Sequence, residues 1–498
     1  MTDVNFITDP LAWQTQTRPT KTAVITLGTG ERLTYAALDD LASRVAAWLI
    51  SRLGDPAGQR IAFLGRNSVE LLVLALGCER VGAIFVPLNW RLAAPELAAL
   101  IADCTPVLVV ADERFAAAAP GALSGADLLA QIRHRAPAVR RPLDPHRPAI
   151  LLYTSGTTGQ PKGVIVTAAN AHAAALNFSL VGEVGLDAVT FSDLPMFHTI
   201  GLIAVARTKL MQGGTLVLTD RFTPPRTLAA LADASLGITH YFAVPVMIEL
   251  LEKEPTFAPS VLSRLHAVFV GGAPLVPALI GRFLGYGVAL VNGYGMSEAG
   301  TVMHMPIDRD AVRANPGSVG FLAPHVEVRL MSDRHNVVDG VTGEIWLRGP
   351  SVTPGYWNRP TETAAAFVDG WYRTGDLARH ETNGQYRIVD RLKDMYVSGG
   401  ENVYPAEVER VLSSHPDVAD AAVIGAPDPH WGEVGVAFIV PRAGTAFDRD
   451  KLTAHVSTRL ARYKCPTRYI EAAAIPRSAS GKILKPALRD RLSQGEHP

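Results

Sequence analysis

A loop rich in glycine, serine and threonine, residues 154–163, carries the clearest chemical signal in this chain. It reads TSGTTGQPKG and joins two runs of β-branched residues. Its glycines let backbone N–H groups turn toward one point, its hydroxyls add donors and Lys162 adds a positive charge, a combination that suits a polyphosphate. It is not a Walker A loop, because the order GxxxxGKS or GxxxxGKT is absent and Lys162 leads into a strand rather than a helix.

Seven further motifs accompany this loop. They lie at residues 195–198 (PMFH), 271–274 (GGAP), 294–298 (YGMSE), 372–376 (YRTGD), 390–394 (DRLKD), 398–405 (SGGENVYP) and 476–482 (PRSASGK). In order and spacing the set resembles the adenylate-forming superfamily, which includes acyl-CoA synthetases, aryl-CoA ligases, nonribosomal-peptide adenylation domains and firefly luciferase. The resemblance covers residues 33–488.

The resemblance implies an ATP-dependent acyl-CoA synthetase. A carboxylate is a poor electrophile, so it is activated by attack on the α-phosphate of ATP, which yields an acyl-adenylate and pyrophosphate, and CoA then takes the acyl group. Positioning and electrostatic stabilisation carry most of such a reaction. The implied cofactors are ATP, Mg²⁺ and coenzyme A, and Mg²⁺ fits because it binds one or two carboxylates together with substrate phosphates.

Four residues receive catalytic roles from the resemblance. Lys482 bridges the carboxylate and the α-phosphate oxygens in the adenylation transition state. Glu298 is the Mg²⁺ ligand, with Thr154 near the phosphates as its companion. His198 lines the route between the acyl site and the incoming thiol. We favour gating over general-base work for His198, because a thiol has a pKa near 8.5 and is intrinsically nucleophilic.

The other site residues bind the nucleotide or CoA by the same resemblance. Asp376 accepts hydrogen bonds from both ribose hydroxyls with help from Arg391, and Tyr294 stacks on adenine. Small residues at 271–273 form the floor under adenine and the acyl group, because they let flat groups approach the backbone. The complete set is Ser155, Gly156, Thr157, Thr158, Gly159, Lys162, Gly272, Ala273, Pro274, Tyr294, Gly295, Met296, Ser297, Asp376, Arg391, Lys393, Ser398, Gly399, Gly400 and Glu401.

The elements that must position these residues follow an α/β pattern. In the first third, Thr34 is placed to cap a helix, and strands are expected at 61–65 and 82–86, an alternation typical of parallel sheets covered by helices. The last stretch predicts a small α+β unit of roughly 105 residues, long enough for its own core. By resemblance, residues 1–392 form a large domain of helix-covered sheets with a distorted β-barrel. Residues 393–498 form a small mobile domain that swings at Lys393.

The segments expected to line the acyl pocket are apolar and small. They are residues 198–200, 241–244, 271–273 and 295–303, and they contain no arginine to pair with a second carboxylate and no tryptophan to shrink the pocket to acetate. A diacid is therefore disfavoured. A medium-chain or longer fatty acid, a phenylpropenoid and a benzoic acid all stay open.

Two basic residues interrupt the apolar stretch 201–211. Arg207 and Lys209 could meet an acidic substrate, but we expect both to extend their charged ends to the surface.

Composition bounds the class of protein. The 498 residues contain 47 Lys plus Arg and 47 Asp plus Glu, so the net charge of zero argues against a protein that coats nucleic acid. The three cysteines lack the CxxC spacing of a zinc site, and their odd number argues against a disulfide scaffold. We find no signal peptide and no membrane-spanning run of apolar residues. Together these observations favour a cytoplasmic protein that acts on small molecules. The sequence leaves the oligomeric state open, a homodimer included.

Several alternatives remain beside CoA ligation. The acyl-adenylate could pass to a carrier protein or an amine, or be oxidised as in luciferase. An amino-acid-activating domain would want an acidic residue near Tyr241 to hold the ammonium, and none is there. A non-catalytic nucleotide-binding scaffold is a rival of another class, but it would not need Lys162, Glu298, Asp376 and Lys482 together.

Overall fold

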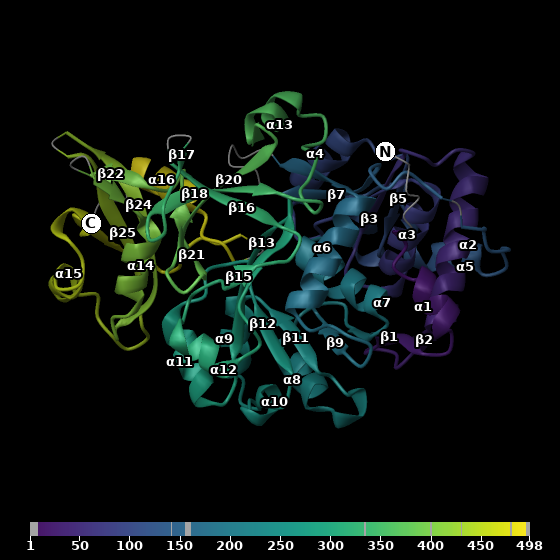
Figure 1. Ribbon diagram of the computed structural model, residues 1–498, viewed down its shortest axis with the longest axis horizontal. Helices are drawn as coiled ribbons and strands as arrows, with labels where there is room; N and C mark the ends of the chain where they lie inside the picture. The colour runs from purple at the N-terminus through teal and green to yellow at the C-terminus, as the bar shows by residue number, and fades with distance from the viewer. Residues whose placement is uncertain are drawn as a thin grey trace.

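The chain folds into two parts, a larger one at the right and centre of Figure 1 and a smaller one at its left. The computed structural model describes residues 8–140, 142–154, 161–332, 335–398, 401–429, 431–478 and 481–494. Three sheets and most of the helices form the larger part, and a fourth sheet with its helices forms the smaller, C-terminal part at the left of Figure 1. The α/β class and this organisation into a large and a small part are as predicted.

The first sheet follows the alternation read from the sequence. Its order is β6-β5-β3-β4-β7-β8, parallel throughout except for the β7–β8 hairpin that flanks the phosphate loop. The strands are β3 (Arg60–Leu64), β4 (Ile84–Leu88), β5 (Leu108–Ala111), β6 (Leu123–Ser124), β7 (Pro148–Thr154) and β8 (Lys162–Thr167).

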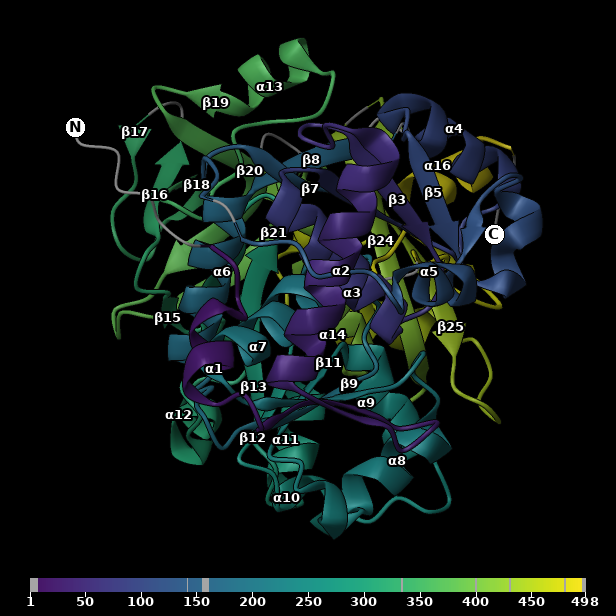
Figure 2. The same cartoon turned by 90° about the vertical axis from the view of Figure 1, so that its right-hand side faces the viewer.

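Helices cover this sheet on its outer side, where α2 and α3 lie in front in Figure 2. The Thr34 hydroxyl accepts a hydrogen bond from the N–H of Ala37 at 3.1 Å, so the predicted cap starts α2. The helices in this part are α1 (Ala12–Thr17), α2 (Tyr35–Leu53), α3 (Val69–Val81), α4 (Ala94–Cys104), η1 (Glu113–Ala118), α5 (Gly125–Ile132) and α6 (Ala168–Val181).

The second sheet carries most of the expected site. Its order is β15-β14-β13-β12-β11-β9-β10-β1-β2, with a parallel centre from β1 to β13 and antiparallel strands at both ends. The strands are β1 (Thr22–Thr26), β2 (Arg32–Thr34), β9 (Val189–Ser192), β10 (Thr215–Leu218), β11 (His240–Ala243), β12 (Ala267–Val270), β13 (Leu290–Met296), β14 (Gly300–His304) and β15 (Phe321–Leu322).

The helices around the second sheet include a π-helical segment, η2, directly after the PMFH motif. They are η2 (Ile200–Arg207), α7 (Thr208–Gln212), α8 (Pro224–Ala232), η3 (Ala234–Leu236), α9 (Pro245–Glu252), α10 (Ser260–Ser263), α11 (Pro277–Gly285) and α12 (Arg309–Ala314). Helix α6 contacts β7 and β8 of the first sheet and β14 of the second, so it lies between the two. Its alanines permit this close packing.

An antiparallel third sheet occupies the place where we expected a distorted barrel. Its order is β17-β16-β18-β20-β19, with β21 paired to β20. A bridge between Gly320 and Tyr386 ties it to the second sheet. The elements are β16 (Glu327–Ser332), β17 (His335–Asn336), β18 (Thr342–Arg348), α13 (Pro360–Ala366), β19 (Phe367–Val368), β20 (Trp371–His380) and β21 (Tyr386–Arg391).

The C-terminal part has its own sheet and its own apolar core. The sheet order is β23-β22-β25-β24, with β26 parallel to β25. Its core includes Val408, Val423 and Ala437, which are fully buried. The elements are β22 (Tyr396–Ser398), β23 (Glu401–Val403), α14 (Pro405–Ser413), β24 (Val418–Asp428), β25 (Gly432–Pro441), α15 (Arg449–Ser457), η4 (Arg462–Lys464), β26 (Arg468–Glu471) and α16 (Lys485–Ser493). The boundary at residues 392 and 393 stays a prediction.

Among the described residues, no helix combines the length and the apolar character that crossing a bilayer requires.

Candidate active site

A buried carboxylate, Asp376, forms the most ordered part of the site. Strand pairing places Asp376 of β20 opposite Arg391 of β21, and the Arg391 Nε lies 3.0 Å from Asp376 Oδ1. The Tyr294 hydroxyl donates to Asp376 Oδ2 at 2.6 Å. Burial, reinforced by this carboxylate, raises the pKa of Tyr294 well above its ordinary value, so Tyr294 stays a neutral donor. Three residues predicted from three different motifs thus meet at one point.

Glu298, the predicted metal ligand, is buried in the turn of the β13–β14 hairpin. It is hydrogen-bonded to Tyr356, which in turn is hydrogen-bonded to Tyr372. The Tyr356 hydroxyl donates to Glu298 Oε1 at 3.2 Å, and the hydroxyls of Tyr356 and Tyr372 are 2.9 Å apart. Burial raises the pKa of Glu298, and the positive charge of Lys482 opposes that shift. We did not anticipate Tyr356 at all, because it lies outside every motif. Tyr372 could have been found, since it opens the YRTGD motif.

The two lysines of the site approach Glu298 from different parts of the chain. The Lys162 Nζ lies 5.5 Å from the centre of the Tyr356 ring, a cation–π distance, and strand pairing sets Lys162 opposite Thr154. Lys482 lies in the turn between residue 478 and α16, where its carbonyl accepts from the Ser478 N–H at 2.8 Å.

Electrostatics show where Lys482 lies relative to the nucleotide-binding groups. Desolvation by nearby protein atoms lowers the pKa of the Lys482 ammonium group, although much of the residue's surface is exposed. The charge of Arg391 lowers it further, whereas the carboxylates of Asp376 and Glu298 raise it. The next residue back, Gly481, lies against α9, because a β-carbon there would be 3.8 Å from Val246. The C-terminal part is therefore oriented with Lys482 turned toward the buried carboxylates.

A buried side chain fixes the backbone turn that carries His198. The buried Asn67 side chain donates to the Leu194 carbonyl and accepts from the Met196 N–H, both at 2.8 Å, which fixes the PMFH turn. The His198 ring packs on Phe197 with centroids 4.5 Å apart. Burial, followed by the charges of Arg91 and Lys482, lowers the pKa of His198 to about 4, so its imidazole is neutral at pH 7. The sequence carries no local signal for Asn67, which is 131 residues before His198.

The predicted floor lies at the carboxyl ends of β12 and β13, where ligands bind in open α/β sheets. Gly272 has φ of +82°, and a β-carbon on it would lie 3.3 Å from Ile200 and 3.5 Å from Val244. At Gly295 a β-carbon would come within 2.4 Å of the Gly300 carbonyl. Side chains are thus excluded at these points. The neighbours Ala273, Pro274, Met296 and Ser297 complete this rim.

The residues predicted to serve CoA lie elsewhere. Ser398 is buried in β22, paired with Glu401 of β23 and next to Gly432 of β25. In Figure 1 this hairpin lies at the outer left of the molecule, well separated from β13. Lys393 follows β21 in a turn beside the nucleotide-binding residues, and burial together with the charge of Arg391 lowers the pKa of Lys393. The structure therefore does not bring Ser398 and Glu401 to the site of Glu298.

Several predicted residues lie outside the described part of the chain. They are Ser155, Gly156, Thr157, Thr158, Gly159, Gly399 and Gly400.

The expectation for Arg207 and Lys209 was wrong, because both are buried in the larger part. Arg207 makes a two-pronged ion pair with Glu79 of α3, at 2.7 and 2.9 Å. Lys209 is 1% exposed, and its Nζ has no hydrogen-bond partner within the described residues. Their segment packs against α6 rather than on the surface. Neither side chain can therefore extend into solvent.

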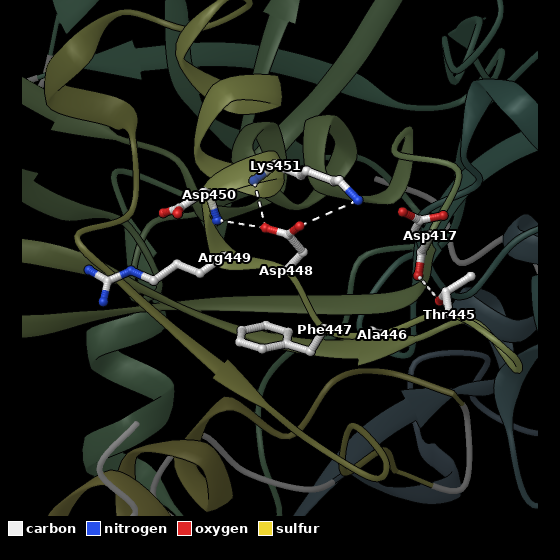
Figure 3. A pocket seen from close by; sticks show the side chains of 8 residues that line it. All are labelled: Asp417, Thr445, Ala446, Phe447, Asp448, Arg449, Asp450 and Lys451. Atoms are coloured by element: carbon white, nitrogen blue, oxygen red, sulfur yellow. Dashed lines mark hydrogen bonds and ion pairs between the residues drawn. The ribbon is translucent and has the colours of Figure 1, made fainter.

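A separate charged pocket of about 600 Å³ lies on the C-terminal part (Figure 3). The loop before α15 lines it, and Asp448 caps that helix by accepting from the N–H groups of Asp450 and Lys451, both at 3.1 Å. It shares no residue with the motifs.

Comparison with known families agrees with this geometry. Residues 11–357 match the model of the AMP-binding enzymes, and residues 407–482 match the model of their C-terminal domain. The chain belongs to the AMP-binding enzyme family. The resemblance to the adenylate-forming superfamily is thereby confirmed.

Relatives of this AMP-binding enzyme include ligases for different acids. A feruloyl-CoA synthase from Amycolatopsis is 39% identical over 475 residues, which cover 93% of this chain and 94% of the relative. A long-chain-fatty-acid–CoA ligase from Mycobacterium tuberculosis is 36% identical over 506 residues, 97% of this chain and 98% of the relative.

Solved structures match the fold closely. ATP-bound MatB from Rhodopseudomonas palustris is 30% identical, with a TM-score of 0.90 and coverage of 98% of this chain and 99% of that chain. The o-succinylbenzoate coenzyme A synthetase of Bacillus subtilis, in complex with ATP and magnesium ion, is 29% identical, with a TM-score of 0.86 and coverage of 97% and 99%.

Glu298 is chemically suited to Mg²⁺ in this AMP-binding enzyme. Within the described ranges, no group of three or more His, Cys, Asp or Glu side chains could form a metal cage. One buried carboxylate near the phosphate-loop lysine matches the way Mg²⁺ binds, with few protein ligands and the remainder from substrate phosphates. Glu298, with Thr154, would hold the ion, which would neutralise charge on the phosphates.

Proposed function

We propose that this AMP-binding enzyme is an AMP-forming acid–CoA ligase that acts on an aromatic monocarboxylic acid. The observation that carries the proposal is the position of Lys482, which comes from the C-terminal part yet lies within electrostatic reach of Glu298, Asp376 and Arg391. A scaffold would not need a lysine there. We expect the enzyme to work in the cytoplasm, where its three free cysteines stay reduced.

In the first half-reaction, an oxygen of the substrate carboxylate attacks the α-phosphorus of ATP. The new carboxyl-oxygen–phosphorus bond forms as the bond from the α-phosphorus to the bridging oxygen breaks, and pyrophosphate leaves. Asp376 and Arg391 hold the ribose, while Lys162 and Lys482 place positive charge where negative charge accumulates. Glu298 would hold Mg²⁺, which when bound would neutralise charge on the phosphates.

In the second half-reaction, the sulfur of CoA attacks the acyl carbon and gives its proton to solvent, and the bond from the acyl carbon to the phosphate oxygen breaks as AMP leaves. A thiol needs no strong base, and His198 has a pKa of about 4, so it suits a gate on the thiol's path better than a proton acceptor. Thioester formation requires the hairpin of Ser398 and Glu401 to replace Lys482 at the site. We assign that exchange to a rotation at Lys393.

The interior beneath the acyl site favours an aromatic acid over a long-chain fatty acid. Phe178 of α6 stacks on Phe242 of β11, with ring centroids 5.6 Å apart, and meets Phe269 of β12 edge to face at 5.2 Å. These three rings fill the interior beside β11 and β12, and their faces and edges suit another ring.

A panel of acids incubated with ATP, Mg²⁺ and CoA tests this function when AMP and thioester are measured separately. We expect both products with aromatic acids. AMP without thioester would favour a carrier protein or an amine as acceptor. No AMP with any acid would favour the nucleotide-binding scaffold.

A further inference from the structure

Four neighbouring strands of the second sheet place two glycines between two flat rings on the face covered by α6, and we call this strip the slot. Reading across the sheet, Phe242 belongs to β11, Gly271 follows β12, Gly293 lies in β13 and His304 in β14. Gly293 and His304 are direct strand partners, and a β-carbon on Gly271 would lie 3.5 Å from the Phe242 ring and 3.3 Å from the Gly293 carbonyl. Two adjacent positions without side chains are thus flanked by two flat rings. The His304 ring lies beside Gly293, because a β-carbon there would be 2.9 Å from the His304 Cδ2.

One end of this slot is closed and the other leads to the expected acyl site. Phe269, two residues before Gly271, lies 5.2 Å from the His304 ring, and Phe178 lies 6.1 Å from it. Beyond Gly271 the backbone reaches Gly272, which lies against Ile200 and Val244. An acyl group entering past Gly272 would therefore meet glycine on its floor, rings on both flanks and rings at its end.

His304 places one polar atom in these apolar surroundings. Its Nδ1 lies 2.7 Å from the Met305 carbonyl, so Nδ1 carries the hydrogen and Nε2 is left as an acceptor. His304 is 5% exposed, and its Nε2 has no hydrogen-bond partner among the residues that the structure describes. The Nε2 lies 3.7 Å from the position that a β-carbon of Gly293 would take. The acceptor thus borders the floor of the slot.

We propose that His304 Nε2 accepts a hydrogen bond from a hydroxyl on the ring edge remote from the substrate carboxylate. The substrate class is then a hydroxylated aromatic acid, an inference that rests on the proposed function. A buried acceptor without a donor is costly, and a hydroxyl group at this depth supplies that donor. Burial also lowers the pKa of His304 to about 4, so Nε2 stays unprotonated at neutral pH.

The test compares acids that share one skeleton. Pyrophosphate release with 4-hydroxycinnamate, cinnamate and 4-methoxycinnamate yields kcat and KM for each, and only the first acid carries a donor. We expect kcat/KM of the native enzyme to favour the hydroxylated acid at least about 100-fold over both others, because sites built around a hydroxyl reject analogues that lack it. A ratio near one in the native enzyme would overturn the proposal without any variant.

Two variants assign the preference to His304. His304→Phe keeps a flat ring and removes the acceptor, so the preference should fall at least tenfold while turnover of cinnamate persists. His304→Gln returns an acceptor and should recover part of the preference. His240→Phe is the matched control, because His240 also contacts Phe269, with centroids 6.0 Å apart, but lies outside the slot, and it should leave the ratio unchanged.

The outcomes separate this proposal from the function on which it rests. Adenylation of aromatic or fatty acids with no dependence on the hydroxyl, or a preference that survives His304→Phe, would overturn the role of His304 and leave the ligase intact. Absence of pyrophosphate release with every acid would overturn the proposed function itself.

Discussion

At the scale of single residues, the site is built on carboxylates whose charges are matched by specific partners. Asp376 is the clearest case, since Tyr294 and Arg391 each take one of its oxygens. Charge-assisted hydrogen bonds of this kind are worth about 1.5–3 kcal/mol each. The interaction depends on the carboxylate being ionised.

Asp376→Asn is expected to weaken ATP binding. The amide removes the charge opposite Arg391 and turns one acceptor into a donor that faces the Tyr294 hydroxyl. We expect the KM for ATP to rise about 10- to 100-fold, measured by initial rates of pyrophosphate release. Asp310→Asn is the control, because Asp310 pairs with Arg313 at the exposed surface of α12, outside every motif. An unchanged KM for ATP in the Asp376 variant would contradict the assignment.

Lys209 makes stability depend on pH. Burial lowers the pKa of Lys209 to about 7 in the folded protein, against 10.5 for its ordinary value. The unfolded chain then binds more protons between pH 7 and 10.5, so stability rises with pH across that window. Lys209→Met should raise the free energy of unfolding at pH 7 by up to about 4 kcal/mol, at 1.36 kcal/mol per pKa unit, and flatten this rise. Urea unfolding at pH 7 and pH 10 measures both, and an equal slope in both proteins would refute the explanation.

At the scale of elements, helix α6 and the β13–β14 hairpin meet at a point where the hairpin has no room for a side chain on Gly300. Gly300 has φ of +66°, and a β-carbon there would lie 2.5 Å from the β-carbon of Ala174. The hairpin also carries Glu298, so this contact helps to position the predicted metal ligand.

Gly300→Ala should therefore cost more than backbone strain alone. We expect a loss of about 2–5 kcal/mol in the free energy of unfolding, from strain at positive φ and from overlap with Ala174. Gly370→Ala is matched to it, with φ of +77° and nothing within 4 Å, and should lose only about 1–2 kcal/mol. Adding Ala174→Gly should restore part of the stability of the Gly300 variant only. Equal losses at Gly300 and Gly370 would exclude the steric contact.

At the scale of the whole molecule, the C-terminal part is held in the orientation that presents Lys482. The Asp390 carboxylate of β21 accepts from the Ala406 N–H at 2.8 Å, and Gly481 lies beside Val246 of α9. Strand β22, which ends at Ser398, lies at the outer left of Figure 1. With Lys482 turned toward the site in this orientation, we propose that the second half-reaction uses a rotation of the C-terminal part.

Lys393→Pro should separate the two half-reactions. Proline fixes φ near −65°, so it restricts the turn that must absorb the rotation, while the present orientation keeps Lys482 in place. We expect pyrophosphate release within about threefold of the native rate and thioester formation slowed about 100-fold or more, because only the second half-reaction needs the blocked conformational step. Lys393→Ala separates the loss of the side chain from the change in the backbone. Equal loss of both half-reactions would rule out Lys393 as the hinge.

The sequence alone determined the chemistry and the local structure. The motifs named Asp376, Arg391, Glu298 and Lys482, and the capping residue Thr34 marked the start of α2, because these signals depend on residue type and short spacing. Periodicity also separated the parallel sheets from the small α+β unit.

Only the tertiary structure decided which distant residues meet. Tyr356 reaches Glu298 from 58 positions away, and Arg207 pairs with Glu79 across 128 positions, which turns an expected surface cation into a buried, paired group. The slot between Phe242 and His304 exists because β11, β12, β13 and β14 lie in that order in one sheet. Local patterns report propensity and spacing, whereas burial, charge pairing and the shape of a pocket arise only when separate strands and helices pack together.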